Sequence, residues 1–217
     1  MKFWIGIFLF SLLLGQLGGF NPSSAVVVYA HDITLVLLLG LAAWELRRVR
    51  KINKPQLLLP IVLFLLAGLM SLALNAYRFS LVQLGQSALY LVRWLVYALL
   101  YLVIVRSSIK SHFWLWGTYG FGVMLAVLGL GQYIFYPDLR NLSYLGWDPH
   151  YGRLFSTLLD PNFTGIVLVL TIFLGIFLWL SQRPQRRLLI FCQILVFLAL
   201  LLTYSRSSYL ALLVGLV

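Results

Sequence analysis

The sequence has few charged residues and almost no cysteine. Only 10% of its 217 residues are charged, and five of these are acidic, whereas soluble domains are about one quarter charged. The one cysteine, Cys192, stands in an apolar run, which excludes a disulfide framework and a CxxC metal site. Short alternating segments of the kind that build a transmembrane β-barrel are also absent. These absences exclude an ordinary soluble domain and a disulfide-stabilised one.

In their place the sequence has 62% hydrophobic residues, arranged in runs that can cross a bilayer. Such runs must be helical, because a lipid-embedded backbone has to satisfy its own hydrogen bonds. We therefore predict an all-α fold: one polytopic transmembrane helix bundle over 1–217, with an eighth helix that begins near Ser207, is cut off at Val217 and is expected to continue. The seven complete spans are predicted at about 3–20, 25–45, 56–74, 88–105, 113–136, 162–181 and 188–204.

Two stretches need separate interpretation. The first run is similar to a secretion signal, but its apolar core is too long and further spans follow, so we interpret it as an uncleaved helix. The segment 75–87 is too polar to span and is expected to lie along the outer membrane interface.

The basic residues predict the orientation of the bundle. Eleven basic residues fall on the same side of the predicted spans as Lys2. The other side has only four, Arg78, Arg140, Arg153 and Arg206, and Arg93 falls within a span. The positive-inside rule therefore places the N-terminus in the cytoplasm, and the net charge of +11 reflects topology and not a nucleic-acid partner. The eleven basic residues on the cytoplasmic side are Lys2, Arg47, Arg48, Arg50, Lys51, Lys54, Arg106, Lys110, Arg183, Arg186 and Arg187.

The largest predicted outer loop, about 137–160, leads into the phrase GRLFSTLLDPNF at 152–163. Asp160 followed by Pro161 is typical of a helix start, where Asp caps free N–H groups and Pro suits the first position; this also accounts for Asn162. A helix start does not explain Arg153. Arg206 falls in a second outer phrase, TYSRSS at 203–208, and either snorkels to the head groups or joins Arg153 in holding a phosphate.

Other residues of this outer side keep two interpretations each. Arg93 lies five or six residues into its predicted span, roughly 8 Å deep, and either snorkels outward or points into the bundle. Asp32 either caps its helix or neutralises an arginine. Trp147 and Tyr151 are either interfacial anchors or sugar-stacking residues, and His150 is either a catalytic base or a surface residue. Since no metal-binding or nucleotide motif is present, we expect a cationic site without metal or cofactor.

The phrases GRLFSTLLDPNFTGIVLVL and LTYSRSSYLALL, separated by a basic turn, resemble the O-antigen ligase and O-antigen polymerase superfamily of bacterial inner-membrane proteins. In that family an R-x-F-x-T…PN phrase opens one span, and a T-x-SR-small phrase opens a span two further on. The segments YAHDITLVLLLGL and LYLVRWLVYALLY are similar to the family's N-terminal half. The chain departs from the family at Leu159–Asn162, where many members have Gly-Asn-Pro-Asn, and at Ser207, where Gly is frequent.

The resemblance implies a metal-independent, inverting glycosyltransferase of cell-surface polysaccharide biogenesis, such as that of lipopolysaccharide. Its donor would be a polyprenyl-diphosphate-linked glycan, and its acceptor a glycan or glycolipid at the outer face of the inner membrane. Arg153 and Arg206, with Arg93 as a further candidate, match positions suited to the diphosphate. The family's catalytic histidine would lie beyond Val217, so residues 1–217 alone are expected to be inactive. The alternative is a transporter or binding subunit for an anionic lipid-linked substrate, although neither repeats nor broken helices favour it.

Overall fold

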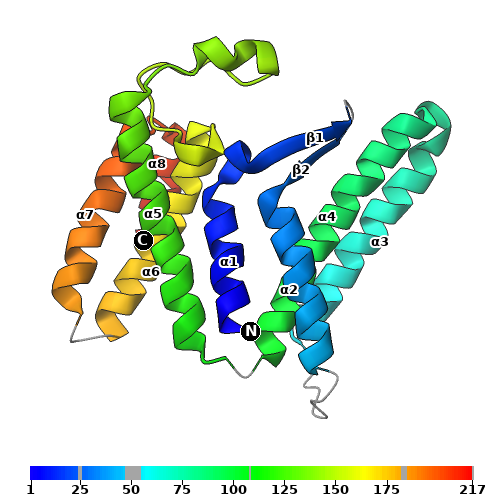
Figure 1. Ribbon diagram of the computed structural model, residues 1–217, viewed down its shortest axis with the longest axis horizontal. Helices are drawn as coiled ribbons and strands as arrows, with labels where there is room; N and C mark the ends of the chain where they lie inside the picture. The colour runs from blue at the N-terminus through cyan, green and yellow to red at the C-terminus, as the bar shows by residue number, and fades with distance from the viewer. Residues whose placement is uncertain (24–25, 47–54, 108, 182–184, 217) are drawn as a thin grey trace. The chain divides into compact units, whose positions relative to one another are not determined.

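The computed structural model describes residues 1–216 except 24–25, 47–54, 108 and 182–184 (Figure 1). The basic run at 47–54 and Arg183, which contribute to the predicted orientation, lie outside the described residues. The described chain is dominated by α-helices, which confirms the predicted helical class, and it adds one short β-hairpin that we did not predict. The chain divides into two compact units: Met1–Phe8 with Gly19–Ile109, and Leu9–Gly18 with Lys110–Val217. This division neither confirms nor contradicts the predicted single domain.

The first unit contains a hairpin and three longer helices. Strands β1 (Gly19–Ser23) and β2 (Val26–Tyr29) pair antiparallel, with Gly19 opposite Tyr29. They lead into α2 (Ala30–Leu46), which is followed by α3 (Leu58–Asn75) and α4 (Leu81–Arg106). α4 packs against both α2 and α3.

The first predicted span ends earlier than expected. α1 comprises Lys2–Leu13 and is about 18 Å long, which is less than the bilayer core. It ends because Gly15 adopts a left-handed backbone with φ of 49°, the conformation that commonly terminates a helix. A Cβ at this position would lie 2.5 Å from the Thr157 carbonyl oxygen, so only glycine fits the close approach. The second half of the predicted span, 14–20, is therefore a turn and the start of the hairpin.

The predicted interfacial segment 75–87 is also corrected. Asn75 ends α3, a short 3-10 turn (Ala76–Arg78) follows, and residues from Leu81 onward belong to α4. Ser80 starts α4 through a reciprocal capping box: its hydroxyl accepts from the Gln83 backbone N–H at 3.4 Å, and the Gln83 side chain accepts from the Ser80 backbone N–H at 3.0 Å. The helix therefore begins seven residues before the predicted position 88.

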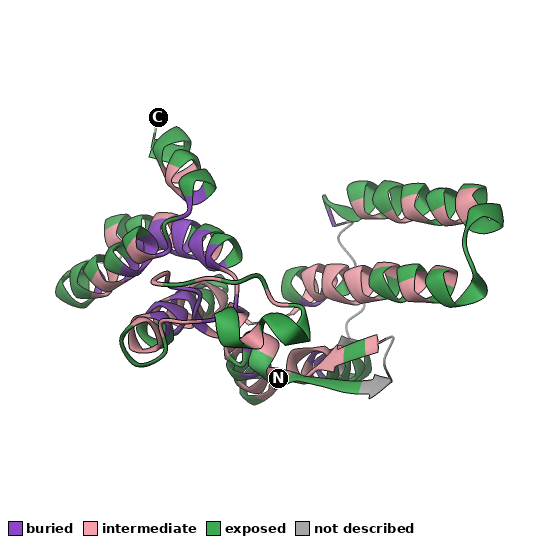
Figure 2. Ribbon diagram, turned by 90° about the horizontal axis from the view of Figure 1, so that it is seen from above, coloured by how far each residue is buried: buried purple, intermediate pink, exposed green. Residues whose placement is uncertain are grey.

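The second unit contains α5 (Ser111–Phe135), α6 (Pro161–Ser181), α7 (Arg186–Leu202) and α8 (Arg206–Leu216). These bounds follow the predicted spans within a few residues. Two 3-10 turns, Arg140–Leu145 and Ser156–Leu158, lie in the loop between α5 and α6. Figure 2 shows the buried residues gathered on the facing sides of α5, α6 and α7. Their core cluster consists of Ala126, Leu154, Leu168, Val169, Ile172, Val196, Ala199 and Leu200.

Four helical segments of the described chain are long and apolar enough to cross a membrane: Leu58–Arg78, Leu81–Arg106, Ser111–Phe135 and Pro161–Ser181. Not one residue in the membrane-length window of Leu58–Arg78 is buried, so this apolar surface needs an apolar surrounding such as lipid. The chain is therefore a membrane protein. The predicted seven complete spans are not reached, because the remaining helices α1, α2, α7 and α8 have only 12, 17, 17 and 11 residues.

Candidate functional site

The start of α6 is built as the sequence predicts. One carboxylate oxygen of Asp160, Oδ1, accepts from the backbone N–H groups of Asn162 at 2.6 Å and Phe163 at 2.8 Å. Pro161 is the first helical residue, where its missing N–H costs nothing. Asp160 and Pro161 are thus explained by helix capping.

Arg153 has a structural role that the sequence did not reveal. Its Nε donates to the Thr203 carbonyl at 2.9 Å, and its Nη2 donates to the Tyr204 carbonyl at 3.2 Å. The next residue, Leu154, donates its backbone N–H to the Leu202 carbonyl at 2.8 Å. The guanidinium therefore closes the end of α7, where carbonyl groups lack helical partners. Two of its five N–H donors are used in this way, and the side chain remains half-exposed.

Gln132 of α5 binds the backbone of the phrase GRLFSTLLDPNF. We did not single it out from the sequence. Its Oε1 accepts from the backbone N–H groups of Phe155 at 2.9 Å and Ser156 at 3.1 Å. Its Nε2 donates to the Tyr136 carbonyl at 2.8 Å. A glutamine within an otherwise apolar run was the available signal, since polar residues in spans usually have a specific partner.

The second phrase meets the first at the start of α8. The Ser205 hydroxyl donates to Asn162 Oδ1 at 3.0 Å and is hydrogen-bonded with the hydroxyl groups of Ser207 at 3.1 Å and Ser208 at 2.9 Å. Gly165 of α6 lets the two helices approach, because a Cβ there would collide with the Ser208 side chain. The two phrases therefore lie together at the first turns of α6 and α8, as the interpretation that pairs Arg206 with Arg153 requires.

Arg206 is the first residue of α8 and is exposed. Among the described residues, no carboxylate or hydrogen-bond acceptor contacts its guanidinium. It lies two residues beyond Tyr204, whose carbonyl accepts from Arg153. The site therefore offers an anion two guanidinium groups and the N-terminus of α8, whereas the N–H groups at the start of α6 are already bound by Asp160.

The backbone of both phrases contains strained residues. Ser156, Leu159 and Tyr204 have φ of 52°, 54° and 49°, the left-handed region that L-residues rarely adopt. Each such residue costs about 1–3 kcal/mol, and such residues cluster at functional sites. Both phrases are therefore held in a conformation that their local sequence alone does not favour.

The predicted sugar-stacking residues of the loop differ in their surroundings. Trp147 is half-buried and packs against Leu139, Phe155 and Leu159, which gives it a structural role. Tyr151 is 64% exposed, and the Arg140 guanidinium lies 4.6 Å from its ring centroid. Of these two residues, Tyr151 alone is exposed, and the Arg140 guanidinium lies over its ring.

Arg140 itself is paired within the loop. It contacts Asp138 at 2.7 Å, and its hydrogen bonds hold the pKa of the Asp138 carboxyl below its usual range. This ion pair is exposed, so it contributes little to stability.

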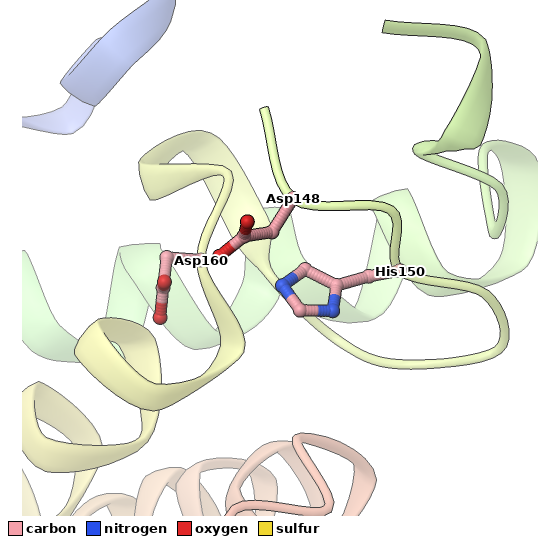
Figure 3. A group of neighbouring side chains, drawn as sticks. All are labelled: Asp148, His150 and Asp160. Carbon is pink, nitrogen blue, oxygen red and sulfur yellow. The ribbon is translucent and has the colours of Figure 1, made fainter. Parts of the chain in front are cut away.

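The same loop brings together a group that sequence spacing did not reveal. Asp148, His150 and Asp160 each place one potential metal-ligand atom within 4.8 Å of the others (Figure 3). Partial burial lowers the pKa of His150 below its usual range, and the positive charge of Arg153 lowers it further, so the imidazole is neutral near pH 7. The cluster was missed because Asp160 follows His150 by ten residues without a recognised motif.

Arg93 belongs to the first unit and is engaged there. Its Nη2 lies 2.9 Å from Asp32 Oδ2 and also donates to the Val27 carbonyl of β2. Asp32 accepts from the Tyr29 backbone N–H at 3.1 Å and from the Tyr97 hydroxyl at 3.2 Å. Asp32 thus both caps α2 and neutralises an arginine.

The position of Arg93 also differs from the prediction. It lies twelve residues after the start of α4, which is about 18 Å along the helix and not the predicted 8 Å. Of the two interpretations, outward snorkelling or pointing into the bundle, the structure shows an inward contact: Arg93 forms an ion pair with Asp32 within the first unit.

The comparisons with known proteins add no relative. No protein-family model matches the sequence. No curated protein matches it, and no solved structure does so either.

Proposed function

We propose that the chain is part of a membrane glycosyltransferase that takes a glycan from a polyprenyl-diphosphate carrier. The observation that carries this proposal is the exposed Arg206 guanidinium at the first turn of α8, beside the first turn of α6 and two residues after the Tyr204 carbonyl that accepts from Arg153. The acceptor would be a glycan or glycolipid, and the reaction would take place on the outer face of a bacterial inner membrane. The resemblance of the two phrases to the O-antigen ligase and polymerase superfamily supports the same class.

The chemistry of the leaving group fits this arrangement. Glycan transfer releases a diphosphate whose negative charge grows in the transition state, and fixed donors that face it lower the barrier. Guanidinium groups match phosphate oxygens in shape and charge. An apolar carrier would remain in the bilayer beside α6 and α8 while its diphosphate reaches these donors at the helix ends.

The arginines divide their roles in this proposal. Arg206 is the principal diphosphate ligand, because none of its donors is used by described residues. Arg153 organises the site by fixing the α7–α8 turn and offers its remaining donors to the ligand. Arg93, with its charge compensated by Asp32, stabilises the first unit and does not bind the diphosphate.

The proposed topology follows the charge distribution. With the N-terminus in the cytoplasm, the loop 137–160 and the α7–α8 turn face outward, where lipid-linked glycans are assembled into surface polymers. The seven-span arrangement is retained as part of this proposal: α2 and α7, with 17 residues each, reach the lower limit for a bilayer span, and the 12-residue α1 would complete its crossing with the 3-10 turn that follows it.

A binding experiment tests the assignment of Arg206. Purified protein in detergent is titrated with a polyprenyl diphosphate and, separately, with the neutral polyprenol of the same length. We expect the diphosphate to bind more tightly, and Arg206→Ala to weaken its binding about tenfold, the lower end for a charge-assisted hydrogen bond. The thermal midpoint of Arg206→Ala should equal that of the wild type, because its guanidinium has no described partner.

Arg140→Ala is the matched control, since Arg140 is an exposed arginine of the same outer loop that is already paired with Asp138. It should leave diphosphate binding unchanged. Equal weakening by Arg140→Ala and Arg206→Ala would mean that overall charge, and not a site at α8, attracts the ligand.

The second candidate function is a subunit that binds an anionic lipid-linked substrate without chemistry, and the same exposed Arg206 favours it. Transfer of a radiolabelled glycan in membrane vesicles distinguishes the two. Diphosphate binding without transfer in vesicles that contain the native protein, donor and acceptor would favour the binding subunit.

A further inference from the structure

We propose that Asp148, His150 and Asp160 bind a divalent transition-metal cation of the Zn²⁺ or Mn²⁺ type. The site lies in the loop between α5 and α6 and ties that loop to the start of α6. This inference does not depend on the proposed glycosyltransferase activity, because it concerns three other side chains.

The three side chains come together from two backbone segments, the loop that carries Asp148 and His150 and the start of α6 at Asp160. Figure 3 shows the His150 ring with one nitrogen toward the carboxylates of Asp148 and Asp160. One potential ligand atom from each residue lies within 4.8 Å of the other two. Metal-bound atoms at about 2.1 Å from an ion lie at most about 4.2 Å apart. Closure therefore requires only a small rotation, which the exposed Asp148 side chain can make.

The backbone that carries His150 is fixed before any ion binds. Its carbonyl accepts from the Leu139 N–H at 2.8 Å, and Gly152 donates its N–H to the Pro137 carbonyl at 2.9 Å. Asp138 and Tyr151 form a β-bridge between these two bonds. The loop thus presents the imidazole from a closed turn, and ligand fixation of this kind favours metal binding.

Asp160 is fixed independently by its capping role. Its Oδ1 is held by the N–H groups of Asn162 and Phe163, and these bonds leave its other carboxylate oxygen, Oδ2, to bind a cation. The ligand groups are therefore supplied by a locked loop and a locked helix start.

A second observation points to a missing partner. The His150 Nε2 atom is buried and has no hydrogen-bond partner among the described residues. Buried ring nitrogens are usually paired, so an unpaired one that faces two carboxylates calls for a ligand. A cation accepts the Nε2 lone pair and also neutralises the two nearby carboxylates.

The donor set selects the class of ion. One imidazole with two carboxylates suits Zn²⁺ or Mn²⁺ better than Ca²⁺ or Mg²⁺, which take oxygen ligands. The two carboxylates balance the charge of a divalent ion; the nearby positive charge of Arg153 opposes the ion, and so does the α6 N-terminus, which is already partly compensated at the Asp160 cap. Three protein ligands also leave at least one coordination position for water.

The test uses the full chain, purified in detergent without a histidine tag and stripped of metal with a chelator. Mn²⁺ binding is followed by electron paramagnetic resonance and Zn²⁺ binding by calorimetry, with Mg²⁺ and Ca²⁺ as comparison ions. We expect one saturable site for Zn²⁺ and for Mn²⁺, weaker binding of the comparison ions, and a higher thermal midpoint with Zn²⁺ bound.

Three variants remove one ligand each: Asp148→Asn, His150→Gln and Asp160→Asn. Each should weaken binding at least tenfold and abolish the thermal shift. Asp160→Asn keeps an efficient helix cap, so its apo form should fold normally. Asp148→Asn changes an exposed side chain and provides an independent test if His150→Gln does not fold.

Two matched controls change the same residue types elsewhere. Asp138→Asn alters a carboxylate of the same loop, and His112→Gln alters a histidine at the start of α5. Both should bind the ion with wild-type affinity. The proposal is overturned if wild-type protein shows no saturable binding, or if the three ligand variants bind as tightly as these controls.

Discussion

Replacement of Arg153 with alanine should destabilise the protein before any ligand is considered. The substitution removes the donors of two hydrogen bonds, to the carbonyl groups of Thr203 and Tyr204 at the end of α7. These carbonyls have no helical partner at that position, so the loss is not compensated within α7. The α7–α8 turn, and with it Arg206, would keep only the backbone hydrogen bond between Leu154 and Leu202 as a hydrogen-bonded attachment to the phrase GRLF.

The expected magnitude follows from the kind of bond. A hydrogen bond from a charged donor contributes about 1.5–3 kcal/mol, and the exposed bond to Tyr204 is worth the lower value or less. Arg153→Ala should therefore lower the free energy of unfolding by about 2–4 kcal/mol. For a protein of this size that corresponds to a thermal midpoint lower by roughly 4–16 °C.

The assay is thermal unfolding of purified protein in detergent, followed by helical circular dichroism and by loss of monodisperse protein. Arg153→Lys keeps the charge but offers a single compact donor group, so it should recover about half of the lost stability. Arg140→Ala provides the control, because an exposed ion pair contributes about 0–1 kcal/mol.

One result would refute this reasoning. If Arg153→Ala kept the wild-type midpoint but lost polyprenyl-diphosphate binding, its contacts with the α7 carbonyls would contribute nothing. Arg153 would then be a ligand residue like Arg206, and the division of roles between them would be wrong.

Two further predictions concern packing and charge within the spans. Gly165→Ala should cost about 1–3 kcal/mol by overpacking against Ser208, whereas Gly85→Ala, which meets open space in α4, should be neutral or stabilising; thermal midpoints compare the two. Asp32→Ala should cost about 3 kcal/mol or less, the low end for a broken buried ion pair, because Arg93 is partly exposed and keeps its hydrogen bond to the Val27 carbonyl. The double variant with Arg93→Leu should be more stable than Asp32→Ala alone, and additive losses in this cycle would argue against coupling.

Local signals in the sequence predicted several elements correctly. The bounds of α5, α6 and α7 agree because long apolar runs set the helix length, although of their three N-termini only that of α6 has a side-chain cap. The start of α6 was predictable because Asp160 and Pro161 act on the N–H groups next to them. The capping box of Ser80 and Gln83 is also a local signal, and it would have predicted that α4 begins at Leu81.

Other features were beyond local signals. α1 stops at Leu13 because Gly15 must approach the Thr157 carbonyl, which lies far along the chain. The strands β1 and β2 form where the sequence predicted the end of the span 3–20 and the start of the span 25–45. Apolar composition alone does not tell a helix from a strand when the run is short and interrupted by glycine and proline.

The amino-acid sequence by itself determined that this is a helical membrane protein and where most of its long helices begin and end. These properties depend on hydropathy and on caps that act within a few residues. The tertiary structure alone decided which partners Arg153 and Arg93 find. Arg153 finds its acceptors about 50 residues away, and Asp32 pairs with Arg93 across two helices. Such partners are set by how helices pack, since hydrogen bonds and ion pairs require contact in space and not proximity in the chain.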